Sequence, residues 1–537
     1  MSILKRTPGQ QDKRKAAQPP EQGSLHKRHK PTLAKEEPSS HGKQSPPSRV
    51  RVSANKGYKD APKRLSTGGA LRPGAWEAVS VVDRQAARAV QQLLQADASG
   101  RGGASIKSLT LAPSIEAKKA THAVTCQTLK LLPVLKQLLE GCSLLQQNPQ
   151  LQRETAYVLV YEILFGEGLR RRGPAEKAVM AAKGDLNTLL QDIKTQAGVE
   201  DVEALLSAEV QRAHEQQRPR TARVNTLKMS VADAVAWLSS PPPEHSRQLP
   251  QEVSIDELLP DVLHFPSGTD LHDHPLVQSA CLILQSKSSC MPAHALRPEP
   301  GWGVLDACAA PGNKTTHVAA LLRGQGQVLA FDRDPKRLAR LKANAKAAAA
   351  FNVEAQQADF LSLPLATDSK FRHIRGALVD PSCSGSGTVR SRMDHLLPSF
   401  ARQGKPDNLQ QASQVDGNGR KGDTSASQDD RSGAEADRIE RLASFQEAAV
   451  KHALLLPSLQ RLVYSTCSVH ERENEAVVAA VLPAAHRLGF HLVDPFPQWH
   501  RRGIAGSVEG AEKLVRVDPY EDQTDGFFIA VFKRVKV

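Results

Sequence analysis

Two cysteines stand where strand-like apolar runs stop. Cys383 lies in "GALVDPSCSGSGTV" and Cys467 lies in "RLVYSTCSVHERENE". Each is flanked by small polar residues at a predicted loop start, where a thiol reaches solvent and its thiolate can act as a nucleophile. The alternative is a pair of buried cysteines that act as small apolar side chains, which is the commoner fate of a lone cysteine. The flanking residues favour the reactive role.

A second candidate site is the loop from Cys308 to Lys314, in "VLDACAAPGNKTTHVAALL". The pattern predicts a strand, a tight turn with one glycine, and a helix that begins at Asn313. In an open α/β sheet, ligands bind beyond the carboxyl ends of the strands, where helix N-termini offer free N–H groups. The loop lacks the G-x-G-x-x-G of dinucleotide sites and the G-x-x-x-x-G-K-[ST] of phosphate loops. Neither a dinucleotide nor a triphosphate is therefore expected.

Acidic residues end the first three predicted strands of this region, namely Asp306, Asp332 and Asp359. Asp332 is placed to accept hydrogen bonds from both ribose hydroxyls of a nucleoside, and Asp359 is placed to meet an adenine amino group. Three acidic residues at successive strand ends suit a nucleoside with no phosphate, such as S-adenosylmethionine. The alternative is that each aspartate caps a following helix, which explains one such residue better than three.

Two thiols beside a sulfonium suit the methylation of cytosine at C5. This carbon is a poor nucleophile, but addition of a thiolate to C6 makes it enamine-like, so that it can take a methyl group. The adduct must then lose its C5 proton and expel the enzyme, so a second group must assist proton removal or release. Asp380 can hydrogen-bond a pyrimidine edge or the cofactor, and the glycines of "CSGSG" let the backbone approach a flipped base.

These residues need a scaffold that brings them together. From residue 292 to residue 537, strand-like and helix-like segments alternate, which predicts an α/β, Rossmann-like parallel sheet with right-handed crossovers. The strands that precede the two cysteines are neighbours in such a sheet, so the thiols should be adjacent. The strand candidates are "GVLDACA", "QVLAFDR", "VEAQQADF", "GALVDPS", "RLVYSTCS" and the closing "DGFFIAVFKRVKV"; helices are expected to begin at Asn313, Pro335 and Glu471.

The preceding sequence divides into three parts. Residues 1–75 form a basic tail whose composition predicts disorder. Residues 76–217 repeat apolar side chains at helical spacing and predict a small helical domain. Residues 218–291 contain a strand, a turn and a helix that begins near Ser230, and predict a small α+β module. Within the sheet domain, the polar stretch 399–437 is expected to be a disordered insertion.

Charge and cysteine content narrow the class of protein. The net charge is +14, from 71 Lys+Arg against 57 Asp+Glu, and most of the excess lies in the tail, whose "KRKAAQ" and "HKRHK" suit nuclear import or contact with phosphates. The 7 cysteines include no C-x-x-C pair, which argues against a zinc site or a disulfide framework and fits a reducing compartment. No secretory signal and no apolar run of about 18 residues is present, so we expect a soluble, intracellular protein without membrane attachment.

Several motifs together resemble one family. The chain contains "RVNTLK", "DACAAPGNKT", "FDRDPKRL", "DPSCSGSGT", "STCSVHERENE" and "DGFFIAVF". At these residues, from roughly Arg218 to Lys533 without the polar insertion, it resembles the Nop/Sun (Fmu-like) RNA cytosine-5 methyltransferases. The segments "LPDVLHFPSGTDLHDHPL" and "DPSCSGSG" resemble the eukaryotic branch that modifies large-subunit ribosomal RNA.

The resemblance implies a role for each matching residue. Cys467 is implied to be the nucleophile that attacks C6, and Cys383 to aid release of the methylated base. The module at 218–291 is implied to help bind RNA. Asp359 is implied less firmly than the others, because this position varies within the family. The residues implied to hold S-adenosylmethionine are Cys308, Ala309, Ala310, Pro311, Gly312, Asn313, Lys314, Asp332, Arg337, Asp359 and Asp380.

Three functions remain open on the sequence. The first is an enzyme that forms 5-methylcytosine in large-subunit ribosomal RNA or a pre-ribosomal particle, as a monomer in the nucleus, within the nucleolus. The second is a ribosome-assembly factor that binds RNA through a methyltransferase-like body without needing catalysis. The third, methylation of DNA cytosine, fits less well, because those enzymes generally take their nucleophile from the fourth-strand motif and need no second cysteine after the fifth strand. No metal site is predicted.

Overall fold

The protein is described by a computed structural model that covers residues 75–99, 105–240, 252–403 and 426–535. The predicted basic tail lies almost wholly outside these residues. No helix in the described ranges is both long enough and apolar enough to cross a membrane.

The largest element is a mixed sheet with strand order β10-β12-β9-β8-β5-β6-β7, and β11 pairs with β12. The five strands from β7 to β9 are parallel, as predicted, but β12 pairs antiparallel with β9. The all-parallel prediction is therefore wrong at this edge. β12 lies between β9 and β10 and runs antiparallel to both, and it also pairs antiparallel with β11, which precedes it after a short connection. The strands are β5 (Gly303–Asp306), β6 (Gln327–Asp332), β7 (Val353–Gln357), β8 (Ile374–Val379), β9 (Arg461–Thr466), β10 (Phe490–Leu492), β11 (Val515–Val517) and β12 (Phe527–Arg534).

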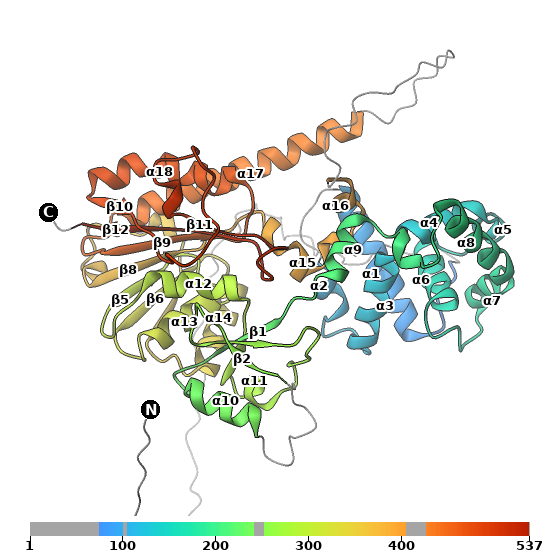
Figure 1. Ribbon diagram of the computed structural model, residues 1–537, viewed down its shortest axis with the longest axis horizontal. Helices are drawn as coiled ribbons and strands as arrows, with labels where there is room; N and C mark the ends of the chain where they lie inside the picture. The colour runs from blue at the N-terminus through green and yellow to red at the C-terminus, as the bar shows by residue number, and fades with distance from the viewer. Residues whose placement is uncertain (1–74, 100–104, 241–251, 404–425, 536–537) are drawn as a thin grey trace, which may run out of the picture. The chain divides into compact units, whose positions relative to one another are not determined.

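Helices cover both faces of this sheet (Figure 1). Because successive side chains of a strand point to opposite faces, Val304 packs with the helices α12, α13 and α14, while Leu305 packs with α17 and α18. Both faces are thus buried, which explains why the central strands read as continuous apolar runs. The helices are α12 (Lys287–Leu296), α13 (Asn313–Leu321), α14 (Pro335–Ala347), α17 (Ala426–Ala453) and α18 (Glu475–Arg487).

The polar stretch 399–437, whose composition predicts a disordered insertion, is helical at both of its described ends. The helix α16 (Pro398–Gln403) begins it, and α17 occupies it from Ala426 onward; residues 404–425 lie outside the described part. The reason is the sequence that follows, since Ala443, Val450 and Ala453 are fully buried at helical spacing. Packing of this C-terminal half holds α17 in place, and the helix continues N-terminally beyond the packed half.

The α+β module is confirmed as a separate sheet of order β2-β3-β1-β4. Its helix α10 (Val231–Ser239) begins after Ser230, whose hydroxyl accepts a hydrogen bond from the Asp233 N–H as an N-cap. The predicted boundary at residue 291 falls inside α12, which packs on the large sheet. The other elements are β1 (Arg220–Val224), β2 (Ser254–Ile255), β3 (Val262–Phe265), α11 (Pro275–Gln278) and β4 (Leu282–Leu284).

One carboxylate connects this module to the domain of the large sheet. Asp261, just before β3, accepts hydrogen bonds from His294 of α12 at 2.7 Å and from His317 of α13 at 2.8 Å. Burial lowers the pKa of His317 to about 3, so this ring is neutral and donates through Nε2. The three ligand-type atoms lie close enough to hold a metal ion, but the two hydrogen bonds already account for their positions.

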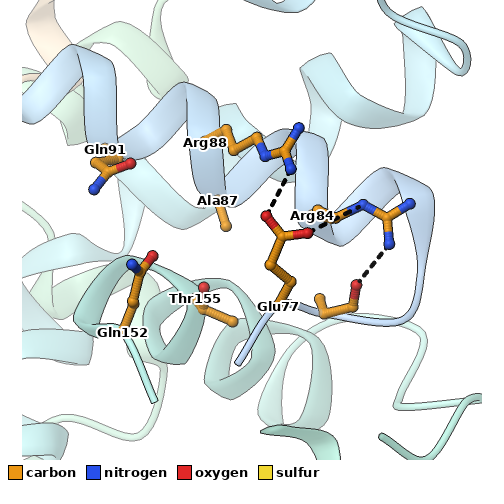
Figure 2. Close-up of a pocket in the computed structure, with 8 residues that line it drawn as sticks. Glu77, Arg84, Ala87, Arg88, Gln91, Gln152 and Thr155 are labelled. Atoms are coloured by element: carbon orange, nitrogen blue, oxygen red, sulfur yellow. Dashed lines mark hydrogen bonds and ion pairs between the residues drawn. The ribbon is translucent and has the colours of Figure 1, made fainter. Parts of the chain in front are cut away.

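The predicted helical domain is also confirmed. Its helices bury one apolar core, in which Leu93, Leu135 and Val158 are almost fully enclosed. Figure 2 shows a pocket between α1 and α6, where Glu77 pairs with Arg88 at 2.6 Å and lies 3.9 Å from Arg84. The helices are α1 (Val81–Ser99), α2 (Ile106–Thr110), α3 (Lys118–Lys130), α4 (Leu132–Gly141), α5 (Leu144–Gln147), α6 (Arg153–Leu164), α7 (Pro174–Ala181), α8 (Lys183–Ala197) and α9 (Ala208–Glu215).

Candidate active site

The two thiols predicted from the sequence are in contact. The Sγ atoms of Cys383 and Cys467 lie 3.2 Å apart. Cys383 follows β8 and Cys467 follows β9. These two strands pair in parallel, with Val379 opposite Tyr464, so the loops that carry the two cysteines leave the sheet at the same edge. Both side chains are half-buried rather than enclosed. The adjacency inferred from the strand pattern is confirmed, and two buried apolar cysteines are not what the structure shows.

Backbone hydrogen bonds join the loops that carry the thiols. Gly387 N–H donates to the Cys467 carbonyl at 2.9 Å, and Gly526 N–H donates to the Gly387 carbonyl at 2.8 Å. A Cβ atom on Gly387 would lie 2.2 Å from the Gly526 oxygen. Glycine is therefore required here for close backbone approach. The loops after β8 and β9 and the turn before β12 form one hydrogen-bonded unit.

Three serine hydroxyls from the segments that follow the two cysteines are hydrogen-bonded to one another. Ser384, Ser386 and Ser468 lie with their Oγ atoms 3.1–3.2 Å from one another. The Val469 N–H donates to the Ser386 Oγ at 3.0 Å. These hydrogen bonds link the segment after Cys383 to the segment after Cys467 and limit how far the two sulfurs can separate.

Sequence reasoning missed Glu473, which is fully buried. Its Oε1 accepts from the Ser384 N–H at 2.9 Å and from Gln446 Nε2 of α17 at 3.0 Å. The Tyr464 hydroxyl donates to the Glu473 carbonyl at 2.5 Å. A buried carboxylate with such donors positions the Cys383 loop. The sequence feature that contains Glu473 is the charged run "HERENE", which predicts the start of a helix at Glu471. In the structure, Glu471–Glu473 is a 3-10 turn and α18 begins at Glu475.

Lys314 and Asp380 form an ion pair next to the thiols. Lys314 Nζ lies 2.8 Å from Asp380 Oδ2, and the Ser465 hydroxyl donates to Asp380 Oδ1 at 2.7 Å. The ammonium group also stands over the Phe527 ring, 5.0 Å from its centre. Burial opposes the charge on Lys314, but Asp380 outweighs it and the pKa of Lys314 is raised, so the amine is a cation. The pair places a fixed positive charge near Cys467.

The electrostatics distinguish the two thiols. A hydrogen bond with Cys383 lowers the pKa of Cys467, and the positive charges of Lys314 and Arg392 lower it further against burial and Asp380. The same hydrogen bond, together with burial and the charges of Asp380 and Glu473, raises the pKa of Cys383. Either sulfur could be the donor in this hydrogen bond. The positive charges of Lys314 and Arg392 favour the ionised form of Cys467 and therefore make Cys467 the acceptor. Of the two sulfurs, Cys467 is therefore the one that ionises more readily, and Cys383 is the one that keeps its proton and can donate it in the shared hydrogen bond.

The cofactor-type loop is built around Asp332 at the end of β6. Asp332 Oδ2 accepts from the Ala310 N–H at 3.2 Å, and Oδ1 accepts from the Asp334 N–H at 3.0 Å. Arg337 donates to the Ala310 carbonyl at 2.5 Å and lies 3.6 Å from the same carboxylate. Gly312 then takes φ +103° and starts α13. The structure therefore brings this loop, Asp332 and Arg337 together.

The residues present fit a ribose diol. A carboxylate offers about four lone-pair positions, and the two N–H donors to Asp332 leave the others for two hydroxyl groups. Asp332 does not cap α14, since Asp334 makes those capping bonds to Lys336 and Arg337. The capping alternative raised by the sequence is thus wrong for Asp332, and its acceptor capacity is available to a nucleoside.

The other two strand-end aspartates behave differently. Asp306 is buried and accepts from the Thr315 hydroxyl at 2.7 Å, and burial raises its pKa to about 7. This hydrogen bond holds the start of α13. The prediction that Asp306 joins Asp332 and Asp359 at a nucleoside is therefore wrong. Asp359 accepts from the Leu361 N–H at 3.1 Å and caps the 3-10 turn Phe360–Ser362, so its proposed contact with adenine stays a prediction. Cys308 is a thiol, because burial raises its pKa to about 12.

The chain matches models of known families. The 16S rRNA methyltransferase RsmB/F model matches residues 293–400 and 427–533. Two models of NOL1/NOP2/Sun domain family member 5 match as well, its N-terminal domain at residues 119–206 and its ferredoxin-like domain at residues 218–285. The predicted helical domain and α+β module therefore correspond to recognised domains of that family.

Curated relatives cover most of the chain. It is 43% identical over 451 residues to the 25S rRNA (cytosine-C(5))-methyltransferase NSUN5 of Arabidopsis thaliana. This alignment covers 84% of this chain and 72% of the relative. It is 37% identical over 445 residues to the 28S rRNA (cytosine-C(5))-methyltransferase of Mus musculus, 81% of this chain and 88% of the relative. The crystal structure of PH0851 shares the fold with a TM-score of 0.53 at 20% identity, covering 83% of this chain and 99% of that one.

The Rossmann-like sheet, the loop around Asp332 and the matching RsmB/F model define an S-adenosylmethionine-dependent methyltransferase. The chain belongs to the NOL1/NOP2/Sun domain family, in the branch of member 5, and is an RNA (cytosine-5)-methyltransferase. The family resemblance read from the motifs is confirmed. The pocket of Figure 2 belongs to the helical domain, and none of the thiol-site or cofactor-loop residues lines it.

Proposed function

We propose that the protein methylates C5 of a cytosine in large-subunit ribosomal RNA, with Cys467 as nucleophile and Cys383 as the group that assists release. The observation that carries this proposal is the 3.2 Å separation of the two sulfurs at the carboxyl edge of the sheet. The two relatives compared above are named for 25S and 28S rRNA, which supports the large-subunit substrate. The loop 308–314, with Asp332 and Arg337, would hold S-adenosylmethionine, which would supply an electrophilic methyl group when bound.

The chain's own residues would act in sequence. The Cys467 thiolate, favoured by Lys314, adds to C6 of an extruded cytosine and makes C5 nucleophilic. After methylation of C5, loss of the C5 proton to a base and cleavage of the C6–S bond restore the aromatic ring and the thiolate. The Cys383 thiol, which donates to the Cys467 sulfur, stabilises the departing thiolate. Asp380 keeps Lys314 in place and retains lone pairs for a pyrimidine edge or the cofactor.

Bisulfite sequencing of large-subunit rRNA tests the substrate and the reaction together. Cells that lack the protein should lose methylation at one cytosine, and the wild-type gene should restore it, whereas Cys467→Ala should not. If no large-subunit cytosine changes, the substrate is wrong. If Cys467→Ala restores methylation, the nucleophile is wrong.

The same cells separate the enzyme from a non-catalytic assembly factor. That alternative requires the protein's body but not its chemistry. If Cys467→Ala rescues ribosome assembly completely while methylation stays absent, the assembly role is independent of catalysis. If neither is rescued by a stable Cys467→Ala protein, methylation is the function that assembly depends on.

We further propose that the module at 218–291 contacts RNA, that the protein is monomeric and free of membrane, and that it acts in the nucleolus. The basic tail at 1–75, of which residues 1–74 lie outside the described part, would direct it there and bind phosphates. Deleting residues 1–70 should weaken RNA binding and reduce its dependence on salt, because fewer counterions are released. An unchanged salt slope together with loss of nucleolar fluorescence would show that the tail is a targeting signal only.

Light scattering of the purified chain tests whether the protein is monomeric.

A further inference from the structure

The sulfur pair has the geometry for a second chemistry, which methylation does not require. The Cys383 and Cys467 sulfurs are 3.2 Å apart, and a disulfide bond needs about 2.05 Å. The gap that rotation of the two side chains has to close is therefore about 1 Å. The backbone bond from Gly387 N–H to the Cys467 carbonyl already holds the loops together.

The surroundings of the pair also suit oxidation. Thiols that react with peroxide are ionised, reach solvent and stand next to a second thiol that can resolve the oxidised sulfur. Cys467 is half-buried, faces the Lys314 and Arg392 charges, and has Cys383 as its neighbour. Cys290, by contrast, is fully buried, and burial raises the pKa of its thiol well above the usual range.

We propose that Cys383 and Cys467 are an oxidation site, at which hydrogen peroxide forms a reversible disulfide that switches the enzyme off. The loss of methylation rests on the function proposed above, whereas formation of the bond does not. Both proposed catalytic sulfurs are consumed by the same bond, so the block is complete rather than partial.

The chemistry balances in two steps. The Cys467 thiolate attacks one oxygen of hydrogen peroxide, the O–O bond breaks, and the products are Cys467 sulfenic acid and hydroxide. The Cys383 thiol, losing its proton, then attacks the Cys467 sulfur; the S–O bond breaks and water leaves with the S–S bond formed. The two sulfurs have lost two electrons to the peroxide. A dithiol reductant returns them by exchange and restores both thiols.

Peptide mapping of the full-length protein tests the bond directly. The protein is treated with hydrogen peroxide, its remaining thiols are alkylated, and it is digested with trypsin. Cleavage after Arg375, Arg390, Arg461 and Arg472 places the two cysteines in "GALVDPSCSGSGTVR" and "LVYSTCSVHER". We expect a linked species that is two hydrogen atoms lighter than the sum of these peptides. It should vanish after dithiothreitol treatment, which should also return activity to near its starting value.

Variants show whether the geometry is responsible. Cys383→Ser removes the resolving thiol, so Cys467 should proceed to the sulfinic acid, which dithiothreitol does not reverse. Cys126→Ser changes a half-buried thiol of the helical domain and should leave both the linked peptide and the recovery of activity as in the wild type.

Each outcome bears on one proposal. If the peroxide-treated wild type shows both peptides alkylated, or Cys467 as sulfinic acid without linkage, the oxidation site is wrong. If the linked species forms but the reduced protein does not methylate RNA, the oxidation site stands and the proposed function fails. If the linked protein methylates RNA at the reduced rate, the switch is wrong even though the bond forms.

Discussion

The two halves of the active site are positioned by different kinds of contact. The cofactor half is local, because Asp332, Arg337 and the Ala310 loop belong to one strand–helix–strand–helix segment and bond to one another. The thiol half joins segments far apart in the sequence, since Gly387 bonds both to the Cys467 loop and to Gly526. Glu473 adds a buried carboxylate that holds the Ser384 backbone.

This difference indicates that the halves can be disturbed separately. A change at the carboxylate of Asp332 should weaken cofactor binding and leave the thiol pair as it is. A change where the loops meet should disturb the thiols and leave cofactor binding nearly normal. Variants of each half should therefore show whether the two halves are as independent as their contacts suggest.

Removal of the nucleophile should have the largest effect. Cys467→Ala should lower the rate of methyl transfer by on the order of 10³-fold or more, because no covalent adduct can form. Binding of S-adenosylmethionine, measured by calorimetry, should change by less than about twofold. Cys126→Ala, at a half-buried thiol of the helical domain, serves as the matched control. Methylation by Cys467→Ala at the wild-type rate would exclude this residue as nucleophile.

Removal of the neighbouring thiol should trap the reaction. Cys383→Ala should allow attack but slow turnover by about 10²-fold, which is the range for loss of a proton-transferring group. A covalent protein–RNA species should then appear on a denaturing gel, and it should be absent from the double variant with Cys467→Ala. Slow turnover without such a species would place Cys383 before the attack rather than at release.

Gly387→Ala tests the contact between the loops. Its Cβ would meet the Gly526 carbonyl oxygen at 2.2 Å, and the backbone shift needed should cost about 1–3 kcal/mol of stability. We expect activity to fall by tens of times while cofactor affinity is retained, which thermal unfolding with and without cofactor can show. Gly433→Ala is the control, because its Cβ would meet no atom within 4 Å. Equal loss of cofactor affinity would show that the halves are coupled.

Asp332→Asn tests the other half. Loss of the charge should weaken cofactor binding by about tenfold, since hydrogen bonds to a charged group contribute about 1.5–3 kcal/mol. Alkylation of the two thiols should keep its wild-type rate. Asp359→Asn sharpens the comparison, because asparagine caps as well as aspartate does. A loss of affinity in that variant would therefore report a direct contact with the cofactor, and no loss would leave Asp359 as a cap.

The smallest effect concerns the charge on Arg392. This cation lowers the pKa of Cys467, so Arg392→Gln should raise it, and less thiolate is then present at any pH below that pKa. The acid limb of the pH–rate profile should move to higher pH, with activity at pH 7 reduced by about threefold. Arg340→Gln, on the exposed side of α14, should leave the profile in place. A shift to lower pH would contradict the assignment of Cys467 as the thiolate.

Much of this site could be predicted from the sequence because its pieces are local. An apolar run followed by small polar residues indicates a strand end, and two such runs place Cys383 and Cys467 at one edge of a parallel sheet. The loop 308–314 is a turn between a strand and a helix, and its residue types alone indicate the ligand. The helical domain and the α+β module follow from periodicity in the same way.

Tertiary structure alone decided which polar groups face the ligand and which are used internally. Asp306 and Asp332 both end strands and both are buried, yet the first accepts from the Thr315 side chain whereas the second accepts from backbone N–H groups of the cofactor-type loop and of the turn after β6. In the sequence, Glu473 is one charged residue within a polar run. In the structure, its side chain is buried and holds the Ser384 backbone. The antiparallel β12 and the helix α17 likewise depend on neighbours distant in sequence. Local patterns specify backbone conformation, but burial and hydrogen-bond partners are set by contacts that no short window of sequence contains.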